Sequence, residues 1–83
     1  MTKEEMLGVL KGEIARVVHR DADLIDDDEK LLEMGVSSIQ AIKIINQVKR
    51  RLNVDINPVV IFEYNRINRL AEYLVTLDAD TVV

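Results

Sequence analysis

Apolar positions recur at helical spacing over much of the chain, beginning close to its start. Thr2 followed by Glu5 has the form of a capping box, and the pattern after it predicts a first helix over about residues 3–20. Gly8 and Gly12 each weaken this helix by roughly 1 kcal/mol relative to Ala, unless they permit the close approach of a neighbour. The apolar positions of this helix are Met6, Leu7, Leu10, Ile14, Val17 and Val18.

A second helical pattern follows Gly35. Ser37 stands at the position of an N-cap with Gln40 three residues later, which predicts a helix over about residues 38–52. Asn53 suits the left-handed residue that closes a helix. The apolar period is nearer 3.6 than 2, which favours a helix over a strand. We expect its buried face to consist of Ile42, Ile45, Val48 and Leu52, with Ile39 and Ile44 at the margins.

Two further helices are predicted after residue 53. Asn57 followed by Pro58 is a helix start signal, so a short helix is expected over about residues 58–64. The last apolar set predicts a helix over about residues 66–76, and residues 77–83 are expected to form a frayed tail. This set consists of Ile67, Leu70, Ala71, Tyr73 and Leu74.

Residues 21–33, called the acidic loop below, separate the first two predicted helices. They contain seven acids and one base, Lys30. A connection of this length is uncommon in a compact domain and is more often functional than idle. The pattern as a whole predicts one all-α domain over residues 1–83, a small four-helix bundle with a long loop between helices one and two and a short third helix. The apolar residues expected to anchor the loop are Leu24, Ile25, Leu31 and Leu32.

Composition narrows the class of protein. With 83 residues, 48% of them apolar, the chain has material for one core. The lack of cysteine fits a reducing cytosol, and no apolar run approaches the roughly 20 residues that span a bilayer, so a cytoplasmic, monomeric protein with no membrane partner is expected. The net charge of -4 argues against nucleic acid as the main partner.

Few residues offer catalytic or metal chemistry. His19 lies near the end of the first predicted helix, where a cation complements the helix dipole. Aligned with a calcium-binding loop from Asp21, the acidic loop places Asp26 at the required glycine and Leu32 at the bidentate glutamate, so no metal site is predicted. The aromatic residues are expected to pack in or around the core rather than to stack on bases: Phe62, Tyr64 and Tyr73.

Ser37 and Ser38 lie at the junction of the acidic loop and the second predicted helix. A hydroxyl in the first turn of a helix lies beside unpaired backbone N–H groups, at the positive end of the dipole, where a covalently attached phosphate is well tolerated. The two serines are therefore candidates for modification, with plain helix capping as the alternative.

The stretch Leu32 to Ile39, LEMGVSSI, resembles the phosphopantetheine attachment motif of acyl and peptidyl carrier proteins, written L-x-x-x-G-x-D-S-[LI]. Residues 41–46 and 61–74 are similar to the second helix and to the "F-E-x-P-T-I-x-x-L-A-x-x-L" ending of polyketide-synthase and peptide-synthetase carriers. The resemblance implies that a phosphopantetheinyl transferase attaches the arm of coenzyme A to Ser38, with Gly35 in the turn before it. The arm would then carry acyl thioesters, and the domain itself would catalyse nothing.

The chain departs from the family pattern at two places. Ser37 replaces the Asp or His that usually precedes the modified serine, so a second hydroxyl is offered beside the site. Ile39 follows Ser38 at the expected place, which favours Ser38 as the modified residue. The usual P-T-I is Asn65-Arg66-Ile67, so Asn65 is expected to supply the start signal of the last helix.

The charge of the second predicted helix bears on partners. Residues 38–52 contain four bases and no acid, whereas carriers of fatty-acid synthases are known for an acidic second helix. We therefore expect acyl-loading and acyl-processing enzymes of a polyketide or hybrid nonribosomal pathway as partners. The alternatives are a peptidyl or aminoacyl carrier, an unmodified helical adaptor and, least favoured, a DNA-binding domain. Met1 just ahead of the first cap favours a discrete protein, although an excised segment cloned at that point would look the same. The residues expected to contact partners are Ile39, Gln40, Lys43, Asn46 and Gln47.

Overall fold

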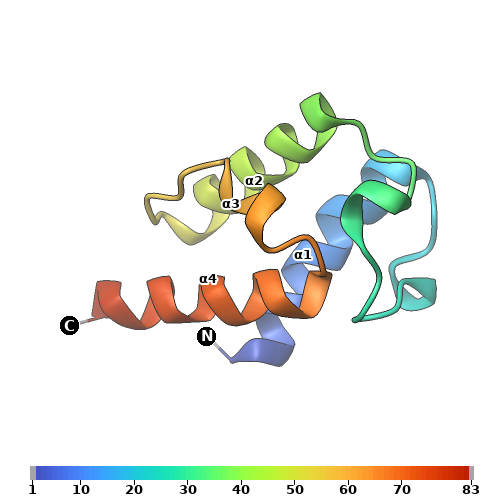
Figure 1. Cartoon of the computed structure of the whole chain (residues 1–83). Helices are drawn as coiled ribbons and strands as arrows, with labels where there is room; N and C mark the ends of the chain where they lie inside the picture. Colours follow the sequence, from blue (N-terminus) through green and yellow to red (C-terminus); the bar gives the residue numbers. More distant parts are fainter. Residues whose placement is uncertain (1, 83) are drawn as a thin grey trace.

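Four α-helices make up most of the molecule in the computed structural model, which describes residues 2–82 and, for side chains, residues 2–77. Within residues 2–82 there is no strand, and only one isolated antiparallel bridge joins Lys30 to Arg66. The prediction of an all-α fold with a short third helix is thus confirmed (Figure 1). The elements are α1 (Lys3–Val18), the short 3-10 helices η1 (Ala22–Leu24) and η2 (Leu31–Glu33), α2 (Ser38–Leu52), α3 (Val60–Glu63) and α4 (Ile67–Val82).

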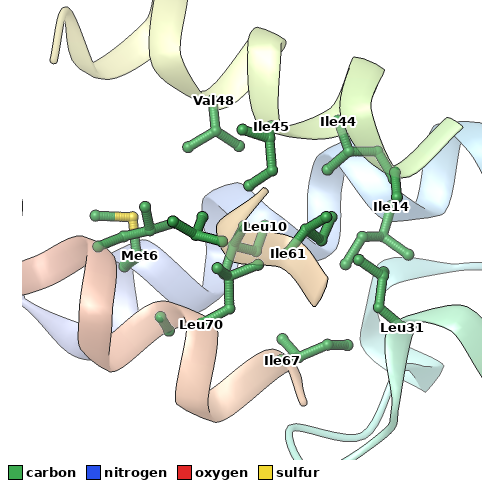
Figure 2. Close-up of a cluster of buried hydrophobic side chains, with 14 of the residues drawn as sticks. Met6, Leu10, Ile14, Leu31, Ile44, Ile45, Val48, Ile61, Ile67 and Leu70 are labelled. Atoms are coloured by element: carbon green, nitrogen blue, oxygen red, sulfur yellow. The ribbon is translucent and has the colours of Figure 1, made fainter. Parts of the chain in front are cut away.

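The core lies where α1 meets the other helices. α1 packs against both α2 and α4, and α3 packs against α2 (Figure 1). Met6, Leu10 and Ile14 of α1 are fully buried and share the core with side chains from η2, α2, α3 and α4 (Figure 2). Burial of this apolar surface supplies the main stabilisation of a small domain without disulfides. The other large core side chains include Leu31, Ile44, Ile45, Val48, Ile56, Ile61, Ile67, Leu70 and Leu74.

Several helix ends differ from the predicted ones. α1 ends at Val18 because His19 takes the left-handed conformation, with φ 57°, and its N–H donates to the Ala15 carbonyl. α3 begins only at Val60, because the residues expected to start it form a turn in which the Asn57 side chain accepts from the Val59 N–H at 3.2 Å.

The prediction that the last helix ends near Thr76 is wrong, because α4 continues to Val82. No Gly or Pro follows Thr76 to stop the helix, and Leu77 still packs, half-buried, against the core. Of the expected frayed tail, the side chains of residues 78–82 and all of residue 83 lie outside the described residues.

The buried face of α2 is rotated from the predicted one. Ile44, expected at the margin, is 2% exposed, whereas Ile42, expected inside, is 37% exposed. The small side chain of Ala41 is fully buried and lets the helix approach its neighbours on that side. The buried stripe therefore consists of Ala41, Ile44, Ile45 and Val48.

The acidic loop has two apolar anchors rather than four. Ile25 and Leu31 are 3% and 1% exposed and belong to the core, but Leu24 and Leu32 are 71% and 40% exposed. Each adjacent pair lies in or next to a short 3-10 helix, where consecutive side chains diverge by about 120°, so only one member of the pair reaches the core.

The acidic loop also caps the start of α4. The Ile67 N–H donates to the Glu29 carbonyl at 3.1 Å, and the Asn68 N–H donates to the Asp27 carbonyl at 2.8 Å. Asn65 was expected to start this helix with its side chain; instead its backbone carbonyl accepts from the Leu31 N–H at 2.8 Å. The first N–H groups of α4 are therefore paired by a segment more than thirty residues away in sequence.

Candidate functional site

The turn before α2 brings the candidate serines to the surface. Gly35 has φ +88°, a conformation that L side chains rarely adopt, so glycine permits this turn. Val36, only 4% exposed, holds the turn to the core. Ser37 then takes an extended conformation, and Ser38 is the first residue of α2.

Ser37 and Ser38 differ in what their hydroxyls do. The Ser37 Oγ accepts from the Gln40 N–H at 3.1 Å, and the Gln40 Oε1 accepts from the Ser37 N–H at 2.9 Å, a complete capping box. Ser38 is exposed, and its hydroxyl makes no hydrogen bond within the part of the chain that the structure describes. The Ser38 hydroxyl is therefore available to react while Ser37 holds the helix terminus.

The electrostatic setting of Ser38 favours an attached phosphate. The first turn of α2 contains no acid, and the positive end of the helix dipole lies at this terminus. A negative group placed there is typically stabilised by about 0.3–1 kcal/mol. Ser38 thus fits the phosphate end of a phosphopantetheine arm.

Ion pairs hold the acidic loop that leads to this site. The Arg20 guanidinium donates two hydrogen bonds of 3.2 Å to the Glu29 carboxylate and a third, of 3.1 Å, to the Leu24 carbonyl. The hydrogen bond from Arg20, helped by the Asp26 N–H, lowers the pKa of Glu29 below its usual range, and the same pair raises the pKa of Arg20. The loop is therefore tied down by its charges as well as by Ile25 and Leu31.

Two further pairs connect the loop to helices. Lys11 of α1 forms an ion pair with Asp27. Arg66, directly before α4, donates to the Asp28 carbonyl at 2.9 Å and to its carboxylate at 3.2 Å. Three of the seven acids, Asp27, Asp28 and Glu29, are therefore paired and help to hold the loop in place.

Four of the five predicted partner-contact residues are exposed on α2. Ile39, 69% exposed, is followed on the solvent side by Lys43, Asn46 and Gln47. Gln40 differs, since it is half-buried and its side chain belongs to the helix cap. Lys43 and Gln47 also border a groove of about 210 Å³ between α1 and α2.

The structure adds residues that the sequence pattern did not single out. Exposed apolar side chains accompany Ile39 on α2 and around α3, namely Ile42, Val59 and Phe62. Glu13 of α1 is buried and pairs with Arg51 of α2 at 3.1 Å. Its spacing of three residues from Leu10 and four from Val17 is a signal that this acid lies on the apolar face of α1, because positions three and four residues apart share a helix face.

Of the other residues considered in the sequence, Tyr64, Tyr73 and His19 take part in contacts of the fold, whereas Phe62 lies outside the core cluster. Tyr64 and Tyr73 stack with ring centroids 4.7 Å apart at the rim of the core, and Phe62 is 40% exposed. His19 closes α1. In the described part of the chain, no cluster of three or more His, Asp or Glu side chains is arranged to hold a metal ion. None of the described helices is long and apolar enough to cross a membrane.

Comparison with known proteins identifies the family. The family model described as "Phosphopantetheine attachment site" matches residues 8–74, and the chain belongs to this family of carrier domains, which bear covalently bound phosphopantetheine. Mycoketide-CoA synthase of Mycobacterium tuberculosis is 32% identical over 72 residues, and polyketide synthase ThaG of Burkholderia thailandensis is 31% identical over 70 residues. These matches cover 86% and 84% of this chain, but only 2% and 1% of the relatives.

Solved structures agree with this assignment. A free-standing peptidyl carrier protein from Acinetobacter baumannii superposes with a TM-score of 0.82 at 27% identity, covering 89% of this chain and 92% of that one. The HMG-ACPI domain of the CurA module from Lyngbya majuscula has the same fold, with a TM-score of 0.83 at 20% identity, covering 96% of this chain and 82% of that one. The fold and the family are thus those of carrier proteins.

Proposed function

We propose that this chain is a non-catalytic acyl carrier whose phosphopantetheine arm is attached to Ser38, in a polyketide or hybrid polyketide and nonribosomal peptide pathway. The observation that carries the choice of residue is the contrast at the start of α2. Ser37 is engaged in the capping box, whereas Ser38 is exposed and its hydroxyl makes no hydrogen bond in the described part of the chain.

Each nearby residue has a distinct role in this proposal. Gly35 permits the turn, Val36 anchors it, and the Ser37–Gln40 cap fixes the first turn of α2, so that the Ser38 hydroxyl stands at a defined position. When bound, the arm supplies a thiol that holds an acyl group as a thioester. Tethering raises the concentration of the acyl group at each partner active site, which is the physical advantage of a carrier.

The proposed partners follow from this role. A phosphopantetheinyl transferase would modify Ser38, and acyl-loading and acyl-processing enzymes would then contact α2 through the exposed residues beside it. The protein would act as a monomer in the cytoplasm, as a single domain over residues 1–83. The residues proposed to meet these enzymes are Ile39, Gln40, Lys43, Asn46 and Gln47.

A second candidate is a peptidyl or aminoacyl carrier of a nonribosomal peptide synthetase. The observation that favours it is the likeness to the peptidyl carrier protein from Acinetobacter baumannii, at 27% identity over most of both chains. The relative at 31% identity, ThaG, is a polyketide synthase, which favours the acyl carrier. Loading assays with acyl and aminoacyl donors separate the two.

The attachment site is tested by intact mass. The wild type, Ser38→Ala and Ser37→Ala are incubated with coenzyme A, magnesium and a broad-specificity phosphopantetheinyl transferase. We expect one phosphopantetheinyl increment in the wild type and Ser37→Ala, and none in Ser38→Ala.

Circular dichroism of each variant shows whether it is folded. If no folded variant gains mass, the carrier proposal fails and an unmodified helical adaptor becomes the better account. An increment that persists in Ser38→Ala but is lost in Ser37→Ala moves the site to Ser37.

A further inference from the structure

Two hydroxyls lie next to each other at the start of α2. Ser37 and Ser38 are adjacent in the sequence, and both residues are exposed. Attachment of one arm requires that one hydroxyl reacts while its neighbour stays unmodified. Exposure alone does not distinguish the two serines, so the choice between them depends on the contacts of their side chains.

The Ser37 side chain is held by a reciprocal pair of hydrogen bonds. Its Oγ accepts from the Gln40 N–H at 3.1 Å, and the Ser37 N–H donates to the Gln40 Oε1 at 2.9 Å. The first bond engages the oxygen that would have to react, and the second fixes the backbone that carries this oxygen. To attack a substrate, the Ser37 Oγ must therefore leave the helix cap.

Gln40 supplies both partners of this arrangement. Its side chain is half-buried, and among the described side chains it alone hydrogen-bonds to Ser37. Ser38 is the first residue of α2, and its hydroxyl makes no hydrogen bond within the described residues. The difference between the two hydroxyls thus depends on Gln40.

The attachment reaction is sensitive to this difference. A serine Oγ forms a bond to the phosphorus of coenzyme A that carries the pantetheine, and the bond from that phosphorus to the bridging oxygen of the diphosphate breaks. Adenosine bisphosphate leaves, and the hydroxyl proton passes to a base of the transferase. The attacking oxygen must turn towards the phosphorus, which the capping box hinders for Ser37 and permits for Ser38.

We propose that Gln40 is a specificity-determining residue that keeps the Ser37 hydroxyl in the helix cap and so directs the arm to Ser38. Gln40 acts through Ser37 and not on the reacting atoms, so it is a positioning residue. Loss of a capping hydrogen bond typically changes an equilibrium about fivefold, which corresponds to about 1 kcal/mol. The inference rests on the proposed function, because it concerns the choice of serine in the same modification.

The test measures the selectivity of the broad-specificity transferase with coenzyme A and magnesium. For each side chain at position 40, the initial rate of mass gain is measured with both serines present and again with Ser38→Ala, where Ser37 is the only serine left. Excess transferase makes the slow second rate measurable. The ratio of the two rates is the selectivity for Ser38. A direct contact of residue 40 with the transferase affects both rates and cancels from the ratio.

The side chain at position 40 is varied in two ways. Gln40→Met removes the acceptor of the Ser37 N–H at similar size and should lower the selectivity about two- to fivefold, since one of the two reciprocal bonds is lost. Gln40→Glu keeps an acceptor three residues after the cap and should retain the wild-type ratio.

The matched control lies in the other capping box of the protein. Glu5→Met removes the acceptor of the Thr2 N–H at the start of α1 and should leave the selectivity unchanged. Circular dichroism shows which variants are folded. If Gln40→Met does not fold, Gln40→Asn takes its place, because its shorter side chain also withdraws the acceptor.

Three results would overturn the inference and leave Ser38 as the attachment site. They are an unchanged ratio in a folded position-40 variant without the acceptor, a fall of equal size in Glu5→Met or Gln40→Glu, and no mass gain on Ser37 in any variant. Failure of the wild type to gain mass on Ser38 overturns the proposed function and this inference with it.

Discussion

The N-termini of α2 and α4 meet the same physical requirement in different ways. Both helices must pair backbone N–H groups that have no partner inside the helix. α2 does so locally, through the capping box of Ser37 and Gln40. α4 instead donates from Ile67 and Asn68 to backbone carbonyls of the acidic loop.

The difference has a functional consequence. A cap made by Ser37 leaves the next residue, Ser38, exposed at the surface, which a reactive hydroxyl requires. A cap made by the acidic loop covers the start of α4 and fixes the loop that leads into α2. The N-terminus of α2 is therefore accessible for modification, and the hydrogen bonds at the N-terminus of α4 hold the acidic loop in place.

The largest effect is expected when Leu31, the buried anchor of the acidic loop, is replaced. Leu31→Ala should lower the free energy of unfolding by about 2–5 kcal/mol, because a side chain that is 1% exposed leaves a cavity. Chemical denaturation measures the change, and amide exchange of Ile67 and Asn68 should accelerate with it.

The adjacent Leu32→Ala is the matched control. Leu32 is 40% exposed, so the free energy of unfolding should fall by less than about 1 kcal/mol. Equal losses for the two leucines would contradict the assignment of Leu31 as the anchor.

A smaller effect is expected at the local cap. Ser37→Ala removes the acceptor of the Gln40 N–H and should cost about 1 kcal/mol of unfolding free energy. Ser38→Ala, one residue on, should change this free energy by less than about 0.5 kcal/mol, because the Ser38 hydroxyl has no hydrogen-bond partner among the described side chains and backbone. Urea unfolding of both apo variants checks the pair, and a Ser38→Ala loss as large as that of Ser37→Ala would refute the division of roles.

The smallest expected effect is pH-dependent and lies in the loop. Hydrogen bonds from Arg20 and from the Asp26 N–H lower the pKa of Glu29 below its ordinary value of 4.5. The pair therefore stabilises the fold fully above about that pH, and this contribution is lost as the pH falls through the lowered pKa. Glu29→Gln should lack this contribution at neutral pH and lose less stability on acidification.

Amide exchange distinguishes this loop effect from a general one. In Glu29→Gln, exchange at Ile67 should accelerate, since the Glu29 carbonyl is its acceptor. Glu72→Gln removes a comparable pair between Lys3 and α4 and should leave that amide unchanged. If Glu29→Gln loses stability on acidification in the same way as the wild type, the pair with Arg20 does not contribute to stability.

Much of the architecture was readable from the sequence, because local signals specify it. The capping residues Thr2 and Ser37 and the left-handed Asn53 are placed by short-range hydrogen bonding and backbone preference. The exposure of Ser38 follows from its place directly after an N-cap. The family motif and the helical periodicity are likewise properties of neighbouring residues.

Other features depended on contacts between distant segments. Which of Ile42 and Ile44 is buried depends on which face of α2 packs against the other elements, and which loop leucine is an anchor depends on where the core lies. The cap of α4 comes from backbone carbonyls of the acidic loop, which no residue near Asn65 in the sequence indicates.

By itself, the sequence determined the helices, their local caps and the position of the candidate serine, since each of these rests on interactions within a few residues. Only the tertiary structure decided the anchoring of the acidic loop, the cap of α4 and the pairing of Glu13 with Arg51. Those depend on residues far apart in the chain, which only packing brings together.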